Sequence, residues 1–234
     1  MEIINTSLKR VFASDVDENG VLRIPYGVTH ISQRCCANNT LIRGVYMPNT
    51  VESIGVRAFE GCTNLINVRM SKNVHHIGTK AFMGCSSLRK IKIPKKVSVL
   101  NPYVFSGTGI IHLKIPKTLE FIGPGAFRYC TNLKKLKISN GVLDIQDYAF
   151  ELCTSLTSVN IPKSVACIGS FAFNTCSSLE SVKISNNTEI RDCAFTHCSK
   201  LKRVRLPKNI CMKGESFDSH VEIIHKHLKE RRVT

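Results

Sequence analysis

Hydrophobic and polar positions repeat along this chain with a period of 22 or 23 residues. Each period holds a segment such as residues 88–93, in which apolar and polar residues alternate before a proline or serine. This alternation predicts a half-buried β-strand, and proline ends a strand because it has no amide hydrogen to donate. The apolar residue that closes the segment recurs at Ile24, Met47, Met70, Ile93, Ile115, Ile138, Ile161, Ile184 and Leu206.

Phenylalanine and cysteine follow the same period. A fixed repeat of this length indicates a solenoid, because one coil cannot bury its apolar side alone and stacked coils form a continuous core. The recurring phenylalanines are Phe59, Phe82, Phe105, Phe127, Phe150, Phe173, Phe195 and Phe217, and the recurring cysteines are Cys62, Cys85, Cys130, Cys153, Cys176 and Cys198.

A full repeat begins with the sequence IGTKAFMGCSSL at residues 77–88 and continues into the alternating segment and its proline. This phrasing resembles the BspA-type leucine-rich repeat, and the resemblance covers roughly residues 21–219. It implies parallel strands on one face of a curved solenoid with irregular segments behind them. It also implies a binding role rather than catalysis, in a family found on bacterial and protist surfaces and among host-directed proteins.

We therefore expect an α/β repeat solenoid, a right-handed leucine-rich-repeat solenoid with a parallel sheet on one face and short helical or irregular turns on the other. Residues 24–219 are expected to form about nine coils. Residues 1–23 are expected to cap the first coil with a hairpin, whose strands are residues 11–12 and 21–24 around an Asn19-Gly20 turn. In residues 220–234, helical spacing of Val221, Ile224 and Leu228 predicts a helical tail.

The recurring cysteines are expected to be buried and unpaired. Free cysteine behaves as a small apolar residue, whereas disulfides between coils would need suitable Cβ geometry at every step, and Thr108 interrupts the series. The sequence has no Cys-x-x-Cys pair, zinc-type spacing, phosphate-binding glycine loop or nucleophile motif. We therefore expect no catalytic residue, metal, cofactor or small-molecule substrate, and we predict that the protein is not an enzyme.

The chain carries 33 basic and 17 acidic residues, a formal charge of +16, which points to a polyanionic partner. The first residues lack the basic start and long apolar core of a signal peptide, and no run approaches the length of a membrane span. We therefore expect a cytoplasmic protein, and delivery into a host cell stays open.

Positive charge is concentrated at positions that strand alternation turns toward solvent. These are the position before each closing apolar residue and the one two residues earlier, and neither column contains an acid. Between Glu60 and Glu120 there are ten lysines and arginines and no acidic residue. The candidate partner-binding residues in the two columns are Arg23, Tyr46, Arg69, Lys90, Lys92, Lys114, Lys135, Lys137, Lys183, Arg203 and Arg205.

Like charges on adjacent strands, about 4.8 Å apart, destabilise a sheet by roughly a few tenths of a kcal/mol each, so their retention suggests an anionic ligand. The alternative is that exposed lysines only keep the strands soluble and discourage edge pairing. Tyr46 is the main aromatic residue on this face, which disfavours base stacking. We favour an acidic protein as the partner of a monomer, with a nucleic-acid backbone and an anionic membrane as alternatives. A secreted or delivered host-interaction protein, an adhesin or effector that binds a host protein, is the second functional hypothesis.

Overall fold

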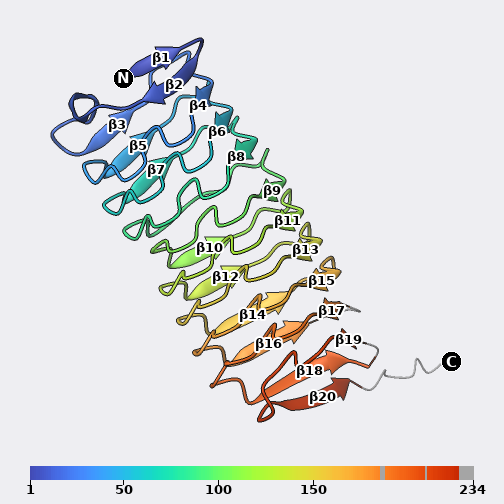
Figure 1. Cartoon of the computed structure of the whole chain (residues 1–234). Coiled ribbons are helices and arrows are strands. Elements are labelled where there is room, and N and C mark those ends of the chain that lie inside the picture. Colours follow the sequence, from blue (N-terminus) through green and yellow to red (C-terminus); the bar gives the residue numbers. More distant parts are fainter. Residues whose placement is uncertain (185–187, 209, 227–234) are drawn as a thin grey trace.

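The structure, a computed structural model, describes residues 1–184, 188–208 and 210–226. It is a stack of coils that runs from the N-terminal cap to the last described strand (Figure 1). One strand of nearly every coil forms what we call the long face. Its strands are β3 (Val21–Arg23), β5 (Gly44–Tyr46), β7 (Asn67–Arg69), β10 (His112–Lys114), β12 (Lys135–Lys137), β14 (Ser158–Ile161), β16 (Ser181–Ile184), β18 (Arg203–Pro207) and β20 (Glu222–Lys226).

After each strand of the long face from β3 to β18, the chain turns and forms a shorter strand on what we call the second face. An irregular segment then leads back to the next coil. The strands of the second face are β4 (His30–Ile31), β6 (Ser53–Ile54), β8 (His76–Ile77), β9 (Val99–Leu100), β11 (Phe121–Ile122), β13 (Asp144–Ile145), β15 (Cys167–Ile168), β17 (Glu189–Ile190) and β19 (Cys211–Met212).

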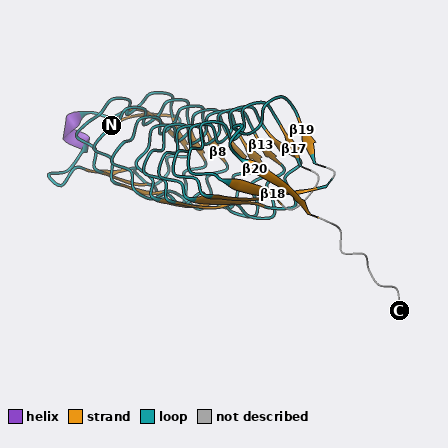
Figure 2. Cartoon of the chain, turned by 90° about the horizontal axis from the view of Figure 1, so that it is seen from below, coloured by secondary structure: helices purple, strands orange, loops and turns teal. Residues whose placement is uncertain are grey.

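Neighbouring coils pair in parallel and in register, so that Lys114 lies beside Lys137 and Ile122 beside Ile145. The predicted solenoid is thus confirmed as a stack of parallel strands. Of the short helical or irregular turns expected on the other face, the structure shows irregular ones, and helical turns are not confirmed. The described residues contain a single helix, the 3-10 turn η1 (Ala13–Asp15) in the cap (Figure 2). No helix within the residues that the structure describes is long and apolar enough to cross a membrane.

The phenylalanines form a continuous stack inside the coils. From Phe59 to Phe217, successive rings lie nearly parallel with centroids 5.1–5.5 Å apart. The rings from Phe59 to Phe195 are fully buried together with the repeating Leu, Ile and Val side chains. Each coil therefore covers the ring of the preceding coil, which is why the phenylalanine keeps the same period as the strands.

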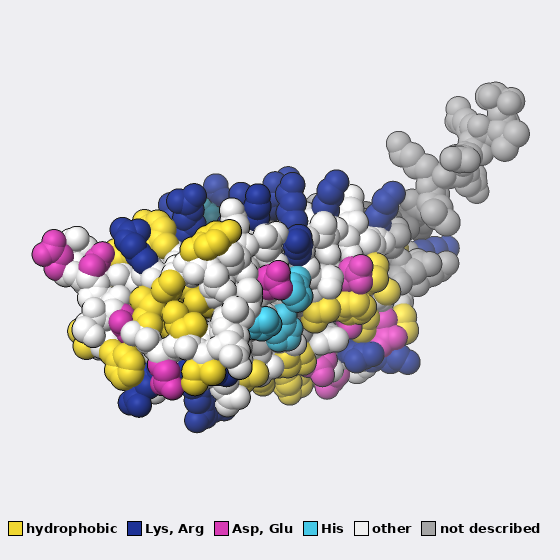
Figure 3. Space-filling model, turned by 90° about the horizontal axis from the view of Figure 1, so that it is seen from above, with side chains coloured by type: hydrophobic (Ala, Val, Ile, Leu, Met, Phe, Trp, Pro, Cys, Tyr) yellow, Lys and Arg dark blue, Asp and Glu magenta, His cyan; other side chains and the backbone are white. Residues whose placement is uncertain are grey.

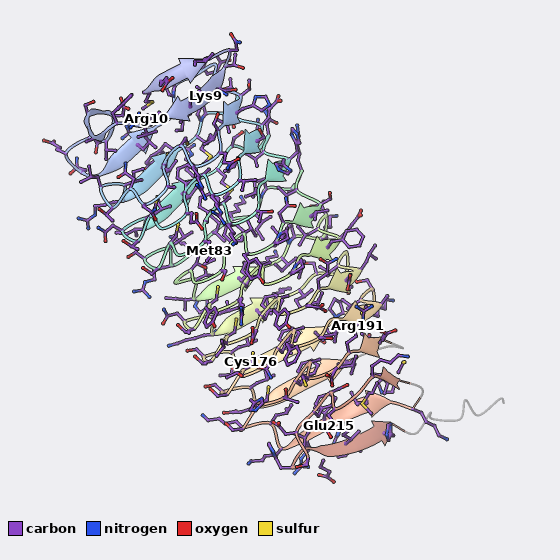
Figure 4. The ribbon with its side chains drawn as sticks, viewed as in Figure 1. Lys9, Arg10, Met83, Cys176, Arg191 and Glu215 are labelled. Atoms are coloured by element: carbon purple, nitrogen blue, oxygen red, sulfur yellow. The ribbon has the colours of Figure 1, made fainter. Side chains whose placement is uncertain are left out.

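The cysteines are all unpaired, and the recurring ones are buried. The Cys85 thiol donates a hydrogen bond of 3.1 Å to the carbonyl oxygen of Phe59, and Cys176 bonds in the same way to Phe150 at 3.4 Å (Figure 4 labels Cys176). Where Thr108 replaces cysteine, its hydroxyl donates to the carbonyl of Phe105 at 2.8 Å. The predicted buried, structural cysteines are confirmed.

A glycine marks the close approach of adjacent coils after the second face. A Cβ atom added to Gly78 would lie 2.6 Å from the amide nitrogen of Val56 and 2.7 Å from the carbonyl carbon of Gly55. Any side chain at this position would force the coils apart. Steric exclusion therefore explains Gly78, whereas other coils hold Asn101, Gln146 or Arg191 at the equivalent position.

The N-terminal hairpin is formed by residues other than those expected. β1 (Glu2–Ile4) and β2 (Ser7–Arg10) pair antiparallel, and β2 pairs in parallel with β4, so the hairpin extends the second face. Asn5 and Thr6 both have positive φ angles, 46° and 62°, which suit a two-residue hairpin turn. The expected second strand is instead β3, the first strand of the long face, and residues 11–12 form no strand.

The prediction of a helix at the C-terminal end is wrong for residues 222–226, which form strand β20. This strand pairs in parallel with β18 from Arg203 to Pro207. The open edge of β18 offers a row of backbone hydrogen-bonding groups, and pairing with that edge outweighs a weak helical periodicity. The rest of the predicted helix, including Leu228, lies outside the described residues.

Candidate partner-binding face

The predicted site residues occupy the outer side of the long face, which we call the basic face. On β7 and β10, alternation exposes Arg69 and Lys114 and buries the apolar residues between the outward positions. Lysine and arginine side chains project in a row along one long edge of the molecule (Figure 3). The folded chain thus turns these cations to solvent.

Strand register brings the cations of adjacent coils side by side. Lys114 pairs with Lys137, and Lys183 pairs with Arg205. In the second column Lys135 lies beside His112. The spacing between such neighbours is that of adjacent strands, about 4.8 Å. The face therefore presents repeated positive charges at the spacing of the coils.

The lysines and arginines of the basic face form no ion pair with a described acidic residue. The ion pairs of the described chain lie elsewhere, for example between Arg128 and Glu151 and between Arg191 and Glu189. Acidic residues instead occupy outward positions of the second face, such as Asp144 and Glu189. The positive charge of the basic face is therefore not neutralised by neighbouring side chains.

The two ends of the basic face differ from its centre. At the N-terminal end, the Arg23 guanidinium stacks over the half-buried Tyr46 ring, 4.8 Å from its centroid. At the C-terminal end, β20 places Glu222 beside Arg203 and Ile224 beside Arg205. The sequence columns did not include these two residues, because β20 was expected to be helical. The basic face therefore ends at β18, and its continuous row of cations from Arg69 to Lys137 ends at β12, because β14 carries Ser158 and Asn160 at its outward positions.

A groove follows the edge of the basic face at which the strands of the long face end. It consists of four hollows of about 290, 780, 510 and 550 Å³, from the N-terminal to the C-terminal side. Consecutive hollows share lining residues: Arg69 joins the first two, Lys92 the middle two and Lys137 the last two. We call this continuous depression the basic groove. None of its lining residues is acidic.

The basic groove includes lysines that the sequence analysis missed. Lys72, Lys95 and Lys117 lie in the turns after the long face and line the groove together with Lys92 and Lys114. Apolar residues such as Ile91, Ile93 and Pro116 line it as well. The sequence did contain a signal for these turn lysines. Lysine recurs two residues after the closing apolar position, at Lys72, Lys95, Lys117, Lys163 and Lys208.

The ladder of the long face is interrupted twice along the groove, between β12 and β14 and, over a whole coil, between β7 and β10. Residues 90–93 form no strand, and among the described residues no hydrogen bond joins their backbone to a neighbouring coil. The two hollows beside this segment measure about 780 and 510 Å³. Lys90 and Lys92 therefore belong to the basic face, but the backbone that carries them has free hydrogen-bonding groups.

The buried thiols are unsuited to nucleophilic or metal chemistry. Burial raises the pKa of Cys62 to about 12 and that of Cys130 to about 11, and it raises the pKa of Cys153 and Cys176 as well. A thiol must ionise to attack or to bind a metal ion. Among the described residues, no group of three His, Cys, Asp or Glu side chains is arranged around a possible ion.

The parallel stack, the phenylalanine column and the strand-turn-strand coils define a leucine-rich-repeat β-solenoid. The sequence model described as "BspA type Leucine rich repeat region (6 copies)" matches residues 10–134 and 120–229, so the chain belongs to this family. No curated protein matches the chain.

Solved structures of bacterial leucine-rich-repeat proteins share the fold. A leucine rich cell surface protein from Faecalibacterium prausnitzii is 25% identical with a TM-score of 0.69, over 92% of this chain and 73% of that chain. A leucine-rich repeat protein from Bacteroides ovatus is 22% identical with a TM-score of 0.63, over 93% and 73%. The T. pallidum Leucine Rich Repeat protein is 24% identical with a TM-score of 0.61, over 79% of both chains. The latter two likenesses concern the fold alone.

Proposed function

We propose that this protein is a non-enzymatic binding scaffold and that its basic face docks an acidic protein surface. The observation that carries the proposal is the row of exposed, unpaired cations from Arg69 to Lys137, with no described acid among them. A rigid repeat surface suits a partner that is itself extended along the stack. Uncompensated charge of one sign speeds encounter with a partner of opposite sign and selects against like-charged proteins.

The test is charge reversal at four positions, Arg69→Glu, Lys92→Glu, Lys114→Glu and Lys137→Glu. These side chains are exposed, so the variant should keep the circular dichroism spectrum and unfolding temperature of a folded solenoid. Affinity capture from a lysate of the cells that make the protein should yield a partner at low salt. We expect the variant to lose this partner, and we expect high salt to release it from the unmodified protein.

A matched control reverses the same number of charges outside the basic face, by Lys9→Glu, Arg10→Glu, Arg34→Glu and Lys213→Glu. These cations are also exposed, and the control variant changes the net charge by the same amount as the variant of the basic face, because each reverses four charges. This control should retain the partner. Capture that survives the reversal of the basic face, or that is lost equally in both variants, contradicts the proposal. A partner removed by nuclease treatment would favour the nucleic-acid alternative.

The second candidate is a secreted or delivered protein that binds a host protein. The observation that favours it is that the 25% identical structure belongs to a protein described as a cell-surface protein. Cytoplasmic location stays a prediction. Antibody detection on intact cells or in culture medium, compared with a cytoplasmic marker enzyme, separates the two. A protein found only with the cytoplasmic marker contradicts this second candidate.

A further inference from the structure

We infer that the basic groove binds an extended acidic segment of a polypeptide, whose main chain contacts residues 90–93. This inference rests on the proposed function and names the form of the acidic partner. It commits to an unfolded peptide segment rather than a folded acidic surface or a nucleic acid.

The shape and lining of the groove favour a peptide. Lys92, Lys95, Lys114 and Lys117 line one hollow together with the apolar Ile91, Ile93 and Pro116. Carboxylates of a peptide can contact these lysines while its apolar side chains contact the apolar part of the lining. A nucleic-acid backbone carries the charge but has no apolar side chains for that part, and the groove offers one aromatic residue, Tyr46, for base stacking.

The free backbone of residues 90–93 adds a second, independent reason. In an extended segment the N–H and C=O groups point sideways toward the adjacent coils. Here no described coil pairs with them, and the hollows of about 780 and 510 Å³ lie on those sides. A peptide main chain supplies both donors and acceptors at such a place, whereas a phosphodiester backbone supplies acceptors alone. Unpaired backbone groups of both kinds are therefore best satisfied by a polypeptide.

The groove length sets the size of the segment. The hollows extend from the coil of Arg23 to that of Lys163, and the coils between them, at about 4.8 Å each, span roughly 29 Å. An extended peptide advances about 3.3 Å per residue, so about nine residues fill the groove. Because such a peptide crosses the coils, only the one or two of its residues that pass over residues 90–93 can bond to their backbone.

The test uses a labelled twelve-residue peptide made of Glu-Glu-Leu repeats, with fluorescence anisotropy as the measure of binding. We expect it to bind the protein and to lose most of its affinity when Lys92→Glu and Lys95→Glu are combined. The matched control, Lys9→Glu with Arg10→Glu, should bind normally. A Lys-Lys-Leu peptide should not bind, and a Glu-Glu-Leu peptide with methylated amides should bind more weakly because it keeps the charge but loses its donors.

Hydrogen exchange provides the readout that charge alone would not change. The amides of residues 90–93 should exchange rapidly in the free protein and slow down when the Glu-Glu-Leu peptide is bound. Peptide binding that leaves these amides unchanged overturns the inference, as does preferential binding of a twelve-base-pair DNA duplex in the same groove.

If the four-site reversal abolishes capture of an acidic protein while the peptide fails to bind, this inference fails and the proposed function stands. If that reversal leaves capture intact, the proposed function itself fails.

Discussion

The smallest repeating feature of this protein is a buried thiol that donates a hydrogen bond to a backbone carbonyl. Cys62 bonds to the carbonyl of Cys36 and Cys130 to that of Phe105, in each case in the preceding coil. Both carbonyls also accept the amide three residues later, from Asn39 and Thr108, so the thiol adds a second hydrogen bond to each and needs little volume. Thr108 shows that a hydroxyl of similar size can occupy the position, with its bond made within its own coil. The chemistry at this position is therefore packing and hydrogen bonding rather than reactivity.

At alkaline pH the buried thiols should destabilise the fold. Burial raises the pKa of Cys62 from 9.0 to about 12, so the folded state keeps a proton that the unfolded chain releases. Stability from this difference is fully present below about pH 9 and is lost as pH rises toward the folded value, by about 1.4 kcal/mol per pH unit for one thiol. We expect the Cys62→Thr variant to show a correspondingly shallower fall in unfolding free energy, measured by urea denaturation between about pH 9 and 11. Equal slopes in both proteins would contradict this assignment.

At the scale of the element, each coil is stabilised by its neighbours rather than by itself. The ring of Phe105 lies between those of Phe82 and Phe127, with both centroids 5.5 Å away. Gly78 allows the backbones of adjacent coils to approach closely at the same time. Strands of two to five residues could not persist alone, so the stack of rings and the close backbone contacts hold them in register.

Truncation of a central ring should therefore cost more than truncation of a terminal one. Phe105→Ala removes a fully buried ring between two others, and we expect the unfolding free energy to fall by about 3–5 kcal/mol. Phe217→Ala removes a ring that is 9% exposed and stacks on Phe195 alone, so its effect should be clearly smaller. Urea denaturation of the two variants measures the difference. A loss of equal size would show that the rings do not act as a stack.

At the scale of the whole molecule, the two faces differ in charge. The outer side of the long face carries lysine and arginine, whereas outward positions of the second face include Asp144 and Glu189. The cations repel one another along the stack, and their charge is free to meet an external anion. The same arrangement that weakens the isolated fold slightly thus suits it to an acidic partner.

This repulsion predicts that salt stabilises the unmodified protein. Chloride at about 0.5 M screens charges beyond a few ångströms, so the unfolding temperature should rise with salt. Neutralising the row with Lys92→Gln, Lys114→Gln and Lys137→Gln should raise the low-salt unfolding temperature by about 2 °C and reduce its dependence on salt. Lys9→Gln, Arg10→Gln and Lys213→Gln serve as the matched control. An equal salt response in all three proteins would contradict repulsion along the basic face.

The sequence alone determined the solenoid, its core and the positions that face solvent. Phe82, Cys85 and Leu88 recur at a fixed separation. Such a period can be recognised without coordinates because the equivalent residues of every coil pack in the same way. Strand alternation then placed Arg69, Lys114 and Lys137 on one surface. The N-terminal hairpin and β20 were missed because single end segments have no period to reveal them, and pairing with an open strand edge overrides their local preferences.

Only the tertiary structure decided where the surface becomes a groove. Lys95 and Lys117 belong to turns, and strand alternation says nothing about turn residues. Their approach to Lys92 and Lys114 depends on how the chain turns away after each strand. The missing ladder at residues 90–93 is a local feature of the long face, because the Phe82 ring of this coil lies 5.2 and 5.5 Å from its neighbours, the same spacing as in coils whose strands pair. Periodicity specifies which residues are equivalent from coil to coil, whereas the local backbone arrangement decides which groups are left unpaired.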